Sequence, residues 1–149
     1  MSFLTLSFFD RYRDYGAVFI RLIVGWHLVY NVQDNILSEA RMLEFVVFLQ
    51  AHGFPFPTFC AYLSVYAQFV CGVLFLLGAF IRPAAVVMIV NFVVAYAMVH
   101  WDLAYAHNFP PLMMLAASLF FLFHGAGRLS VDDWRARRQV GAGALALEG

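Results

Sequence analysis

Four long apolar stretches dominate the sequence, and they decide which kind of fold the chain can adopt. They run roughly over residues 15–37, 58–80, 83–101 and 109–124. Each is close to the ~20 residues that an α-helix needs to cross the ~30 Å hydrocarbon core of a bilayer. Charged residues make up only 12% of the chain, and a soluble domain averages about 25%. The sequence therefore predicts an all-α integral membrane protein, a bundle of four transmembrane helices, and excludes a water-soluble domain.

The segment between the first two stretches has a different pattern. Residues 38–53 place apolar side chains such as Met42 beside Glu39 and Arg41, which favours an amphipathic helix lying in the membrane interface. The two prolines in residues 53–57 end this helix and return the chain to the bilayer, because each disfavours helical geometry in the residue before it. A re-entrant hairpin is the alternative.

Prolines also mark the other two connections. Only Arg82 and Pro83 interrupt the apolar run between the second and third stretches, which predicts an antiparallel helical hairpin turning at these residues. Pro110 and Pro111 are expected to begin the fourth helix, because a missing amide costs least in the first turn. Residues 102–108 then form a loop.

Arginines predict the orientation of the bundle. Arg41 lies on one side of the predicted membrane; the arginines of the other side are Arg11, Arg13, Arg82, Arg128, Arg135, Arg137 and Arg138. Because positive charge favours the cytoplasm, both termini are expected there. Residues 1–134 then form one membrane domain and residues 135–149 a cytoplasmic tail, in which Ser130 and Asp133 have the spacing of a helix N-cap and residues 141–149 are expected to be disordered.

Ionisable residues inside a span are costly and usually turn inward, so they are the best pointers to function. The first helix carries His27, Asn31 and Asp34 at positions i, i+4 and i+7, with Tyr30 beside them. This spacing places the first three on one stripe of the helix. The stripe is expected to line a cavity toward the outer surface.

Three further residues complete the candidate site. Arg21 lies deeper in the first helix, where it either snorkels toward the cytoplasm beside Asp14 or binds an anion, a carboxylate or a quinone oxygen. Gln68 is surrounded by small residues in the second span, so it faces the bundle and either bonds a neighbouring helix or contacts a ligand. His100 ends the third span, which also carries Asn91 near its middle.

His27, Tyr30 and Asp34 are expected at the same outer depth as His100, Asp102 and His107. This cluster could hold a metal or relay protons at a quinone headgroup. His27, His100 and His107 are the candidate metal ligands. No helix carries two histidines at i, i+4, so neither a metal nor a bis-histidine haem is the favoured interpretation. The chain has no nucleotide, flavin or iron–sulfur motif, and its zero formal net charge gives no support for nucleic acid as a partner.

Several segments together resemble the DoxX family of small four-span bacterial and archaeal membrane proteins. They are residues 20–22 with Gly25, the turn at residues 53–57, Gln68 with residues 71–78, residues 82–85, His100, and residues 125–132. The last segment, Gly-Ala-Gly-Arg-Leu-Ser-Val-Asp, is the most specific. The resemblance extends roughly over residues 15–134.

The resemblance implies a four-helix membrane bundle in the inner membrane of a bacterium. It also implies an association with redox chemistry, because the relatives that give the family its name are subunits of thiosulfate:quinone oxidoreductase or terminal quinol oxidase systems. Gln68 stands where the family commonly has an acid, and Asn31 and Asp34 stand where a glycine and a basic residue are common. A neutral amide at Gln68 does not accept a proton at ordinary pH.

These observations lead to two expected functions. The first is a quinone-linked redox subunit, whose intramembrane polar cavity is lined by Arg21, His27, Tyr30, Asp34, Gln68 and His100. The alternative is a non-catalytic accessory subunit of a larger membrane complex, such as a respiratory one. Lipid is an expected partner in both cases, together with other membrane subunits or a second copy of the chain.

Overall fold

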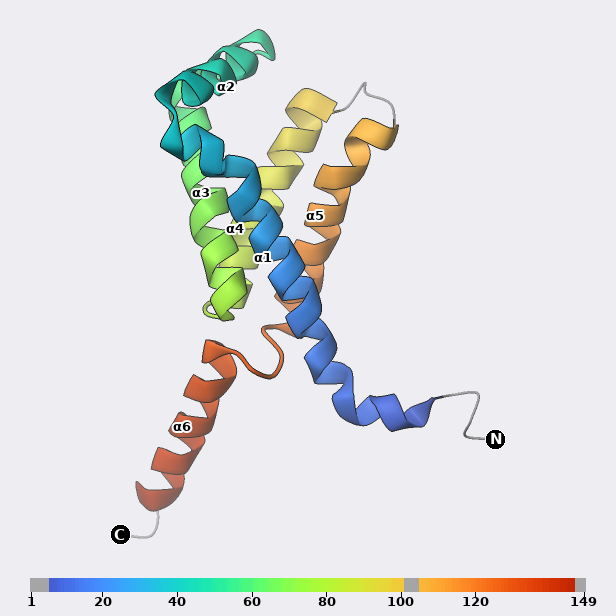
Figure 1. Cartoon of the computed structure of the whole chain (residues 1–149). Helices are drawn as coiled ribbons and strands as arrows, with labels where there is room; N and C mark the ends of the chain where they lie inside the picture. The colour runs from blue at the N-terminus through green and yellow to red at the C-terminus, as the bar shows by residue number, and fades with distance from the viewer. Residues whose placement is uncertain (1–5, 101–104, 147–149) are drawn as a thin grey trace.

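The computed structural model describes residues 6–100 and 105–146, and these form helices joined by short turns (Figure 1). After a 3-10 helix, Ser7–Tyr12, four helices are long and apolar enough to cross a membrane. They are α1 (Arg13–Leu37), α3 (Pro57–Leu77), α4 (Ile81–Ala95) with the π-helical turn Tyr96–His100 that continues it, and α5 (Tyr105–His124). The prediction of an all-α membrane bundle with four spans is confirmed.

Two further helices, α2 (Glu39–Ala51) and α6 (Val131–Ala146), lie at opposite ends of the bundle (Figure 1). We call the end with α2, the last turn of α1 and the start of α5 the α2 end. The α6 end holds the start of α1, the turn between α3 and α4, and the end of α5. Both ends of the described chain lie at the α6 end, as four crossings require.

The helix expected between the first two spans is confirmed as α2. Ser38 caps it, since its hydroxyl accepts a hydrogen bond from the backbone N–H of Arg41 at 3.5 Å. Its buried side chains, Met42, Val46 and Leu49, pack on α1 and α3. The chain then turns through Gly53, with φ +74°, and Pro57 opens α3.

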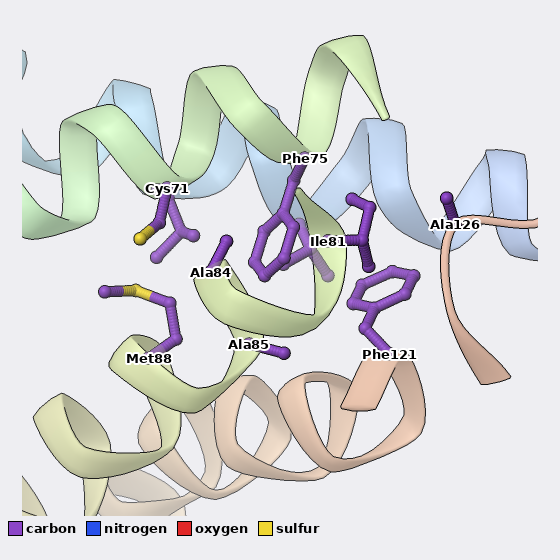
Figure 2. Packing of buried hydrophobic residues seen from close by; sticks show 10 residues of the cluster. Cys71, Phe75, Ile81, Ala84, Ala85, Met88, Phe121 and Ala126 are labelled. Carbon is purple, nitrogen blue, oxygen red and sulfur yellow. The ribbon is translucent and has the colours of Figure 1, made fainter. Parts of the chain in front are cut away.

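The main core lies toward the α6 end and joins all four spans (Figure 2). Its buried residues are Val24, Leu28, Cys71, Phe75, Ile81, Ala84, Ala85, Met88, Phe121 and Ala126. At its centre the rings of Phe75 and Phe121 lie 5.1 Å apart between centroids. The helices α3 and α5 are thereby fixed to each other and to the start of α4.

The second core lies toward the α2 end and joins only three helices. Its buried residues are Val32, Met42, Val46, Leu49, Ala61 and Val65, which belong to α1, α2 and α3. None belongs to α4 or α5. At the main core α1 and α3 approach closely, because a Cβ on Gly25 would lie 2.8 Å from the carbonyl oxygen of Gly72. Small residues at this contact are therefore required.

The prediction that Arg82 and Pro83 form the turn between the second and third spans is wrong. The turn is made by Gly78, Ala79 and Phe80, where Gly78 ends α3 with φ +70°. Arg82 and Pro83 instead lie in the first turn of α4. Proline fits there because the amides of a first turn have no intrahelical partner.

Two helix boundaries also differ from expectation. The helix α5 begins at Tyr105, so Pro110 and Pro111 lie inside it rather than at its start. Because proline has no N–H, the carbonyls one turn before Pro110 and Pro111 lose their helical partners. These carbonyls belong to the exposed start of α5, so the helix tolerates the two prolines. At the other end, α6 runs through residue 134 and on to Ala146, past the point where a disordered end was expected.

Candidate functional site

An apolar groove of about 510 Å³ lies between α2, α3 and α4, toward the α2 end. Its walls are built by Phe45, Phe48, Leu49, Phe54, Cys60, Leu63, Ala67, Val86, Val87, Val90, Val94, Ala95 and Val99. Two polar side chains, Ser64 of α3 and Asn91 of α4, complete the lining. The groove is thus an apolar channel with polar atoms at one place, the composition typical of small-molecule sites.

The two polar side chains of the groove belong to a chain of hydrogen bonds that begins at Gln68, beside the groove. Gln68 Nε2 donates to Ser64 Oγ at 3.1 Å, and Ser64 Oγ donates to Asn91 Oδ1 at 2.8 Å. Because Oδ1 of Asn91 accepts the hydroxyl, its Nδ2 group is left as the donor of that side chain. We call these three residues the amide–hydroxyl group. It joins α3 to α4 and leaves a donor beside the groove.

Gln68 thus bonds Ser64 of its own helix, and Ser64 makes the bond to the neighbouring helix α4. It precedes Cys71 by three residues and Phe75 by seven, and both lie in the core that joins the four spans. That spacing places Gln68 on the face of α3 that turns to the bundle interior. The hydrogen bond from Gln68 to Ser64 was not predicted, although residues four apart on one helix are neighbours and this spacing could have suggested it.

The polar stripe of α1 continues the face of the helix that carries the core residue Val24. His27 and Asn31 follow Val24 by three and seven residues, and Val24 packs in the core with Phe121 of α5. His27 Nε2 and Asn31 Nδ2 form a hydrogen bond of 2.6 Å. His27 is half-buried and Asn31 is exposed, so the other spans of this chain do not cover the stripe completely.

Further predicted site residues with described side chains are exposed on α1 and α5. Tyr30 stacks on Trp26, with ring centroids 6.3 Å apart, and both are exposed on the outer surface of α1. Asp34 is exposed near the α2 end of the same helix, and His107 is exposed in the first turn of α5. His100 closes the π-helical turn, and its side chain lies outside the described part of the structure, as does the whole of Asp102.

Arg21 lies at the α6 end, where it binds the chain itself. The residue is only 3% exposed, and its Nη1 and Nη2 donate to the carbonyl oxygens of Ala126 and Leu129, both at 2.9 Å. Its guanidinium packs on Gly78, which is ten residues from Gln68 along α3, or about 15 Å. The structure therefore does not bring Arg21 and Gln68 into one cavity.

Asp132 makes a second link at the same end, one that the sequence did not predict. Its Oδ1 accepts from the backbone N–H of Phe80 at 2.9 Å, and its Oδ2 accepts from Ile81 at 3.0 Å. The carboxylate thus caps the N-terminus of α4, where the helix dipole favours negative charge. With its own N–H donating to the Gly78 carbonyl at 3.1 Å, Asp132 anchors the start of α6. We call Arg21 and Asp132 with these partners the α6 clamp.

The described residues contain no group of three His, Cys, Asp or Glu side chains placed to hold a metal ion. His27 and His107, two of the three candidate ligands, come from α1 and from the start of α5. The third, His100, has no described side chain. Toward the α2 end, the groove and its amide–hydroxyl group are therefore the candidate site for a small molecule.

A comparison with known protein families shows to which family the chain belongs. The family model described as DoxX matches residues 16–101. The chain belongs to the DoxX family. The matched region extends from α1 into the π-helical turn after α4, so it contains the groove and every residue of the amide–hydroxyl group of this DoxX protein. The α6 clamp lies partly outside the match, since Asp132 follows it.

A relative supports the membrane assignment of the DoxX chain. It is an uncharacterized membrane protein of Mycobacterium tuberculosis, 33% identical over 107 residues. The match covers 62% of this chain and 65% of the relative, so less than two thirds of the relative is spanned. No solved structure matches the chain.

Proposed function

We propose that this DoxX protein is the quinone-binding membrane subunit of an electron-transfer system. The observation that carries the proposal is the groove of about 510 Å³ with a hydrogen-bond donor beside its apolar walls. An isoprenoid quinone needs an apolar channel for its tail and one or two donors for its ring oxygens. The residues that line the groove therefore fit such a molecule.

The amide–hydroxyl group would orient the bound ring. Gln68 donates to Ser64, and this fixes the hydroxyl hydrogen toward Asn91 Oδ1. The Nδ2 group of Asn91 is then left to donate to a carbonyl oxygen in the groove. Phe45, Phe48 and the valines of α4 exclude water from the channel, and this strengthens the hydrogen bond.

A bound quinone would supply a two-electron, two-proton acceptor. The chain carries no motif for a nucleotide, flavin or iron–sulfur cofactor, so the electron donor in this proposal belongs to a partner subunit. The bacterial inner membrane, with both termini in the cytoplasm, remains the proposed location, since the arginines gather at the α6 end.

The test measures binding of a short-chain quinone to the purified protein. Asn91→Leu should weaken binding about tenfold, the effect expected for one buried hydrogen bond of ~1.4 kcal/mol. The matched control is Asn31→Leu, because Asn31 is an amide on the α1 stripe and not a lining residue of the groove. Loss of binding in Asn31→Leu alone, or no saturable binding to the unchanged protein, would contradict the proposal.

The accessory-subunit function is supported by a different observation. Among the described residues that line the groove there is no carboxylate or imidazole, so this part of the lining offers no ordinary proton donor. Asn31 and Asp34 are also exposed on α1, and another membrane protein could cover them. Purification in a mild detergent tests this function: a stable larger assembly supports it, and a monomer without companions contradicts it.

A further inference from the structure

A second cavity, of about 750 Å³, lies at the α6 end between the first turn of α4, the end of α5 and the start of α6. Its lining is rich in charge. The charged residues are Asp14, Arg82, Arg128, Asp132, Asp133 and Arg137, with His124 beside them. The apolar groove between α2, α3 and α4 shares no lining residue with this cavity, so the two are separate.

Two of the three acids in the cavity are already engaged by other groups of the chain. Asp132 accepts two backbone hydrogen bonds at the start of α4. Asp133 pairs with Arg137, whose Nη2 lies 3.0 Å from the Asp133 carboxylate. Asp14, the third acid of the lining, also takes part in an interaction within the chain.

Two arginines of the cavity have no such compensation within the described residues. Arg82 is exposed and makes no hydrogen bond or ion pair there, and Arg128 contacts only the ring of Tyr15, 5.9 Å from its centroid. The Arg82 guanidinium lies against Gly125, where an added Cβ would be 3.8 Å from its Nε and Nη2. It therefore reaches from α4 to the end of α5. The three arginines and three aspartates of the lining balance in formal charge, but the guanidinium groups of Arg82 and Arg128 remain available to an anion.

The position of the cavity decides which anion can reach it. Arg82 is in the first turn of α4, and His124 is the last residue of α5. In a bundle of membrane spans these helix ends lie at one surface of the bilayer, at the depth of the lipid phosphates. Tyr15 and Trp134 at the same end are residue types that gather at this depth.

We propose that this cavity binds the phosphate headgroup of an anionic phospholipid, with Arg82 and Arg128 as its charged ligands. A guanidinium offers two parallel N–H donors that match phosphate oxygens. Phe80 and Pro83 of the lining give apolar surface beside the headgroup. A soluble phosphate has the same charged group but no acyl chains to use that surface.

The test uses the full chain in a mild detergent. Phosphatidylglycerol, or phosphatidylcholine with the same acyl chains, is titrated in, and retained lipid is measured by native mass spectrometry. Phosphatidylglycerol should be retained in preference. Arg82→Gln and Arg128→Gln should each weaken its retention about fivefold, the effect of one arginine at an anionic surface.

Arg138→Gln is the matched control, because Arg138 lies over Trp134 at 3.9 Å and does not line the cavity. It should retain phosphatidylglycerol like the unchanged protein. Circular dichroism should show equal helical content in all three variants, since neither Arg82 nor Arg128 donates a hydrogen bond within the described chain.

Three results would overturn the proposal. Equal retention of the two lipids would show that charge does not select the ligand. An equal loss in Arg138→Gln would show a diffuse attraction to the basic end rather than a site. Inorganic phosphate, tested alone as a competitor, should displace the lipid poorly; displacement at the same concentration as the lipid would assign the cavity to a soluble anion instead.

Discussion

The two ends of the bundle are built on different principles. At the α6 end all four spans share one core, around Phe75 and Phe121, and the α6 clamp ties three distant segments together through Arg21 and Asp132. At the α2 end the buried residues of the core belong to α1, α2 and α3, and the Ser64–Asn91 hydrogen bond links α3 to α4 there. The same four helices are therefore firmly joined at one end and loosely joined at the other.

This difference separates stability from binding. The two side chains of the α6 clamp, Arg21 and Asp132, are engaged with other parts of the chain. Toward the α2 end Asn91 retains an unused donor beside an apolar groove. Local stability follows the density of buried contacts, and binding sites draw on the less stable regions of a fold. Substitutions in the α6 clamp should thus affect folding most, and those in the amide–hydroxyl group should affect quinone binding most.

The largest effect is expected for Gly78→Ala. An added Cβ would collide with Arg21 Nη1 and would lie 2.6 Å from Ser130 Cβ, at a φ of +70° that alanine disfavours. Strain and overpacking together should lower the free energy of unfolding by about 3 kcal/mol. Reversible unfolding in mixed detergent micelles, followed by circular dichroism, measures the change.

Two other glycines separate the two causes. Gly53 has a φ of +74° but nothing within 4 Å of an added Cβ, so Gly53→Ala should cost only the backbone strain of about 1 kcal/mol. Gly16 is helical with open space around it, and Gly16→Ala should stabilise the protein slightly. If Gly78→Ala lowers the free energy of unfolding no more than Gly53→Ala does, the claim that the α6 clamp packs closely around Gly78 is wrong.

The next effect is the loss of the cap on α4. Asp132→Ala removes two hydrogen bonds to the backbone of Phe80 and Ile81, and should cost about 1–2 kcal/mol. The matched control is Asp133→Ala, because this neighbour pairs only with the exposed Arg137 and should cost about 0.5 kcal/mol or less. Thermal unfolding of the two variants measures the difference. Equal losses of stability would contradict the claim that Asp132 stabilises the protein by capping α4.

The smallest effect on stability is expected at the α2 end. Ser64→Ala breaks the link from Gln68 to Asn91 and should cost about 0.6 kcal/mol, a typical value for a hydrogen bond between membrane helices. Ser118→Ala is the control, since Ser118 bonds Met114 within its own helix. Unfolding in mixed micelles again provides the free energies. A loss for Ser64→Ala that exceeds the one for Asp132→Ala would reverse the comparison of the two ends.

The sequence predicted the spans well because hydropathy and length are properties of each segment alone. The cap of α2 by Ser38 and the Ser130–Asp133 spacing at the start of α6 are equally local, and Asp133 N–H does donate to Ser130 Oγ at 3.1 Å. Proline gave a less reliable signal. It fits anywhere in the first turn or two of a helix, so it did not fix the start of α4 or α5.

Contacts between distant segments could not be predicted. Arg21 binds the carbonyls of Ala126 and Leu129, more than a hundred residues away, and every residue has a carbonyl, so no side-chain pattern marks these partners. Asp132 likewise binds backbone N–H groups of another helix. For the candidate site, Gln68 was expected to face the bundle and does, but its partner Ser64 and the groove depend on how α2 and α4 pack against α3.

The asymmetry of the bundle is tested most directly by distances between spin labels on α1 and α5, measured by electron–electron resonance in lipid nanodiscs. One pair, at Phe19 and Phe123, reports on the α6 end, and the other, at Tyr30 and Phe109, on the α2 end; all four residues are exposed. Replacing Cys60 and Cys71 removes the native thiols. The account predicts a narrow distance distribution for the first pair and a clearly broader one for the second. Equal widths, or a broader distribution at the α6 end, would contradict it.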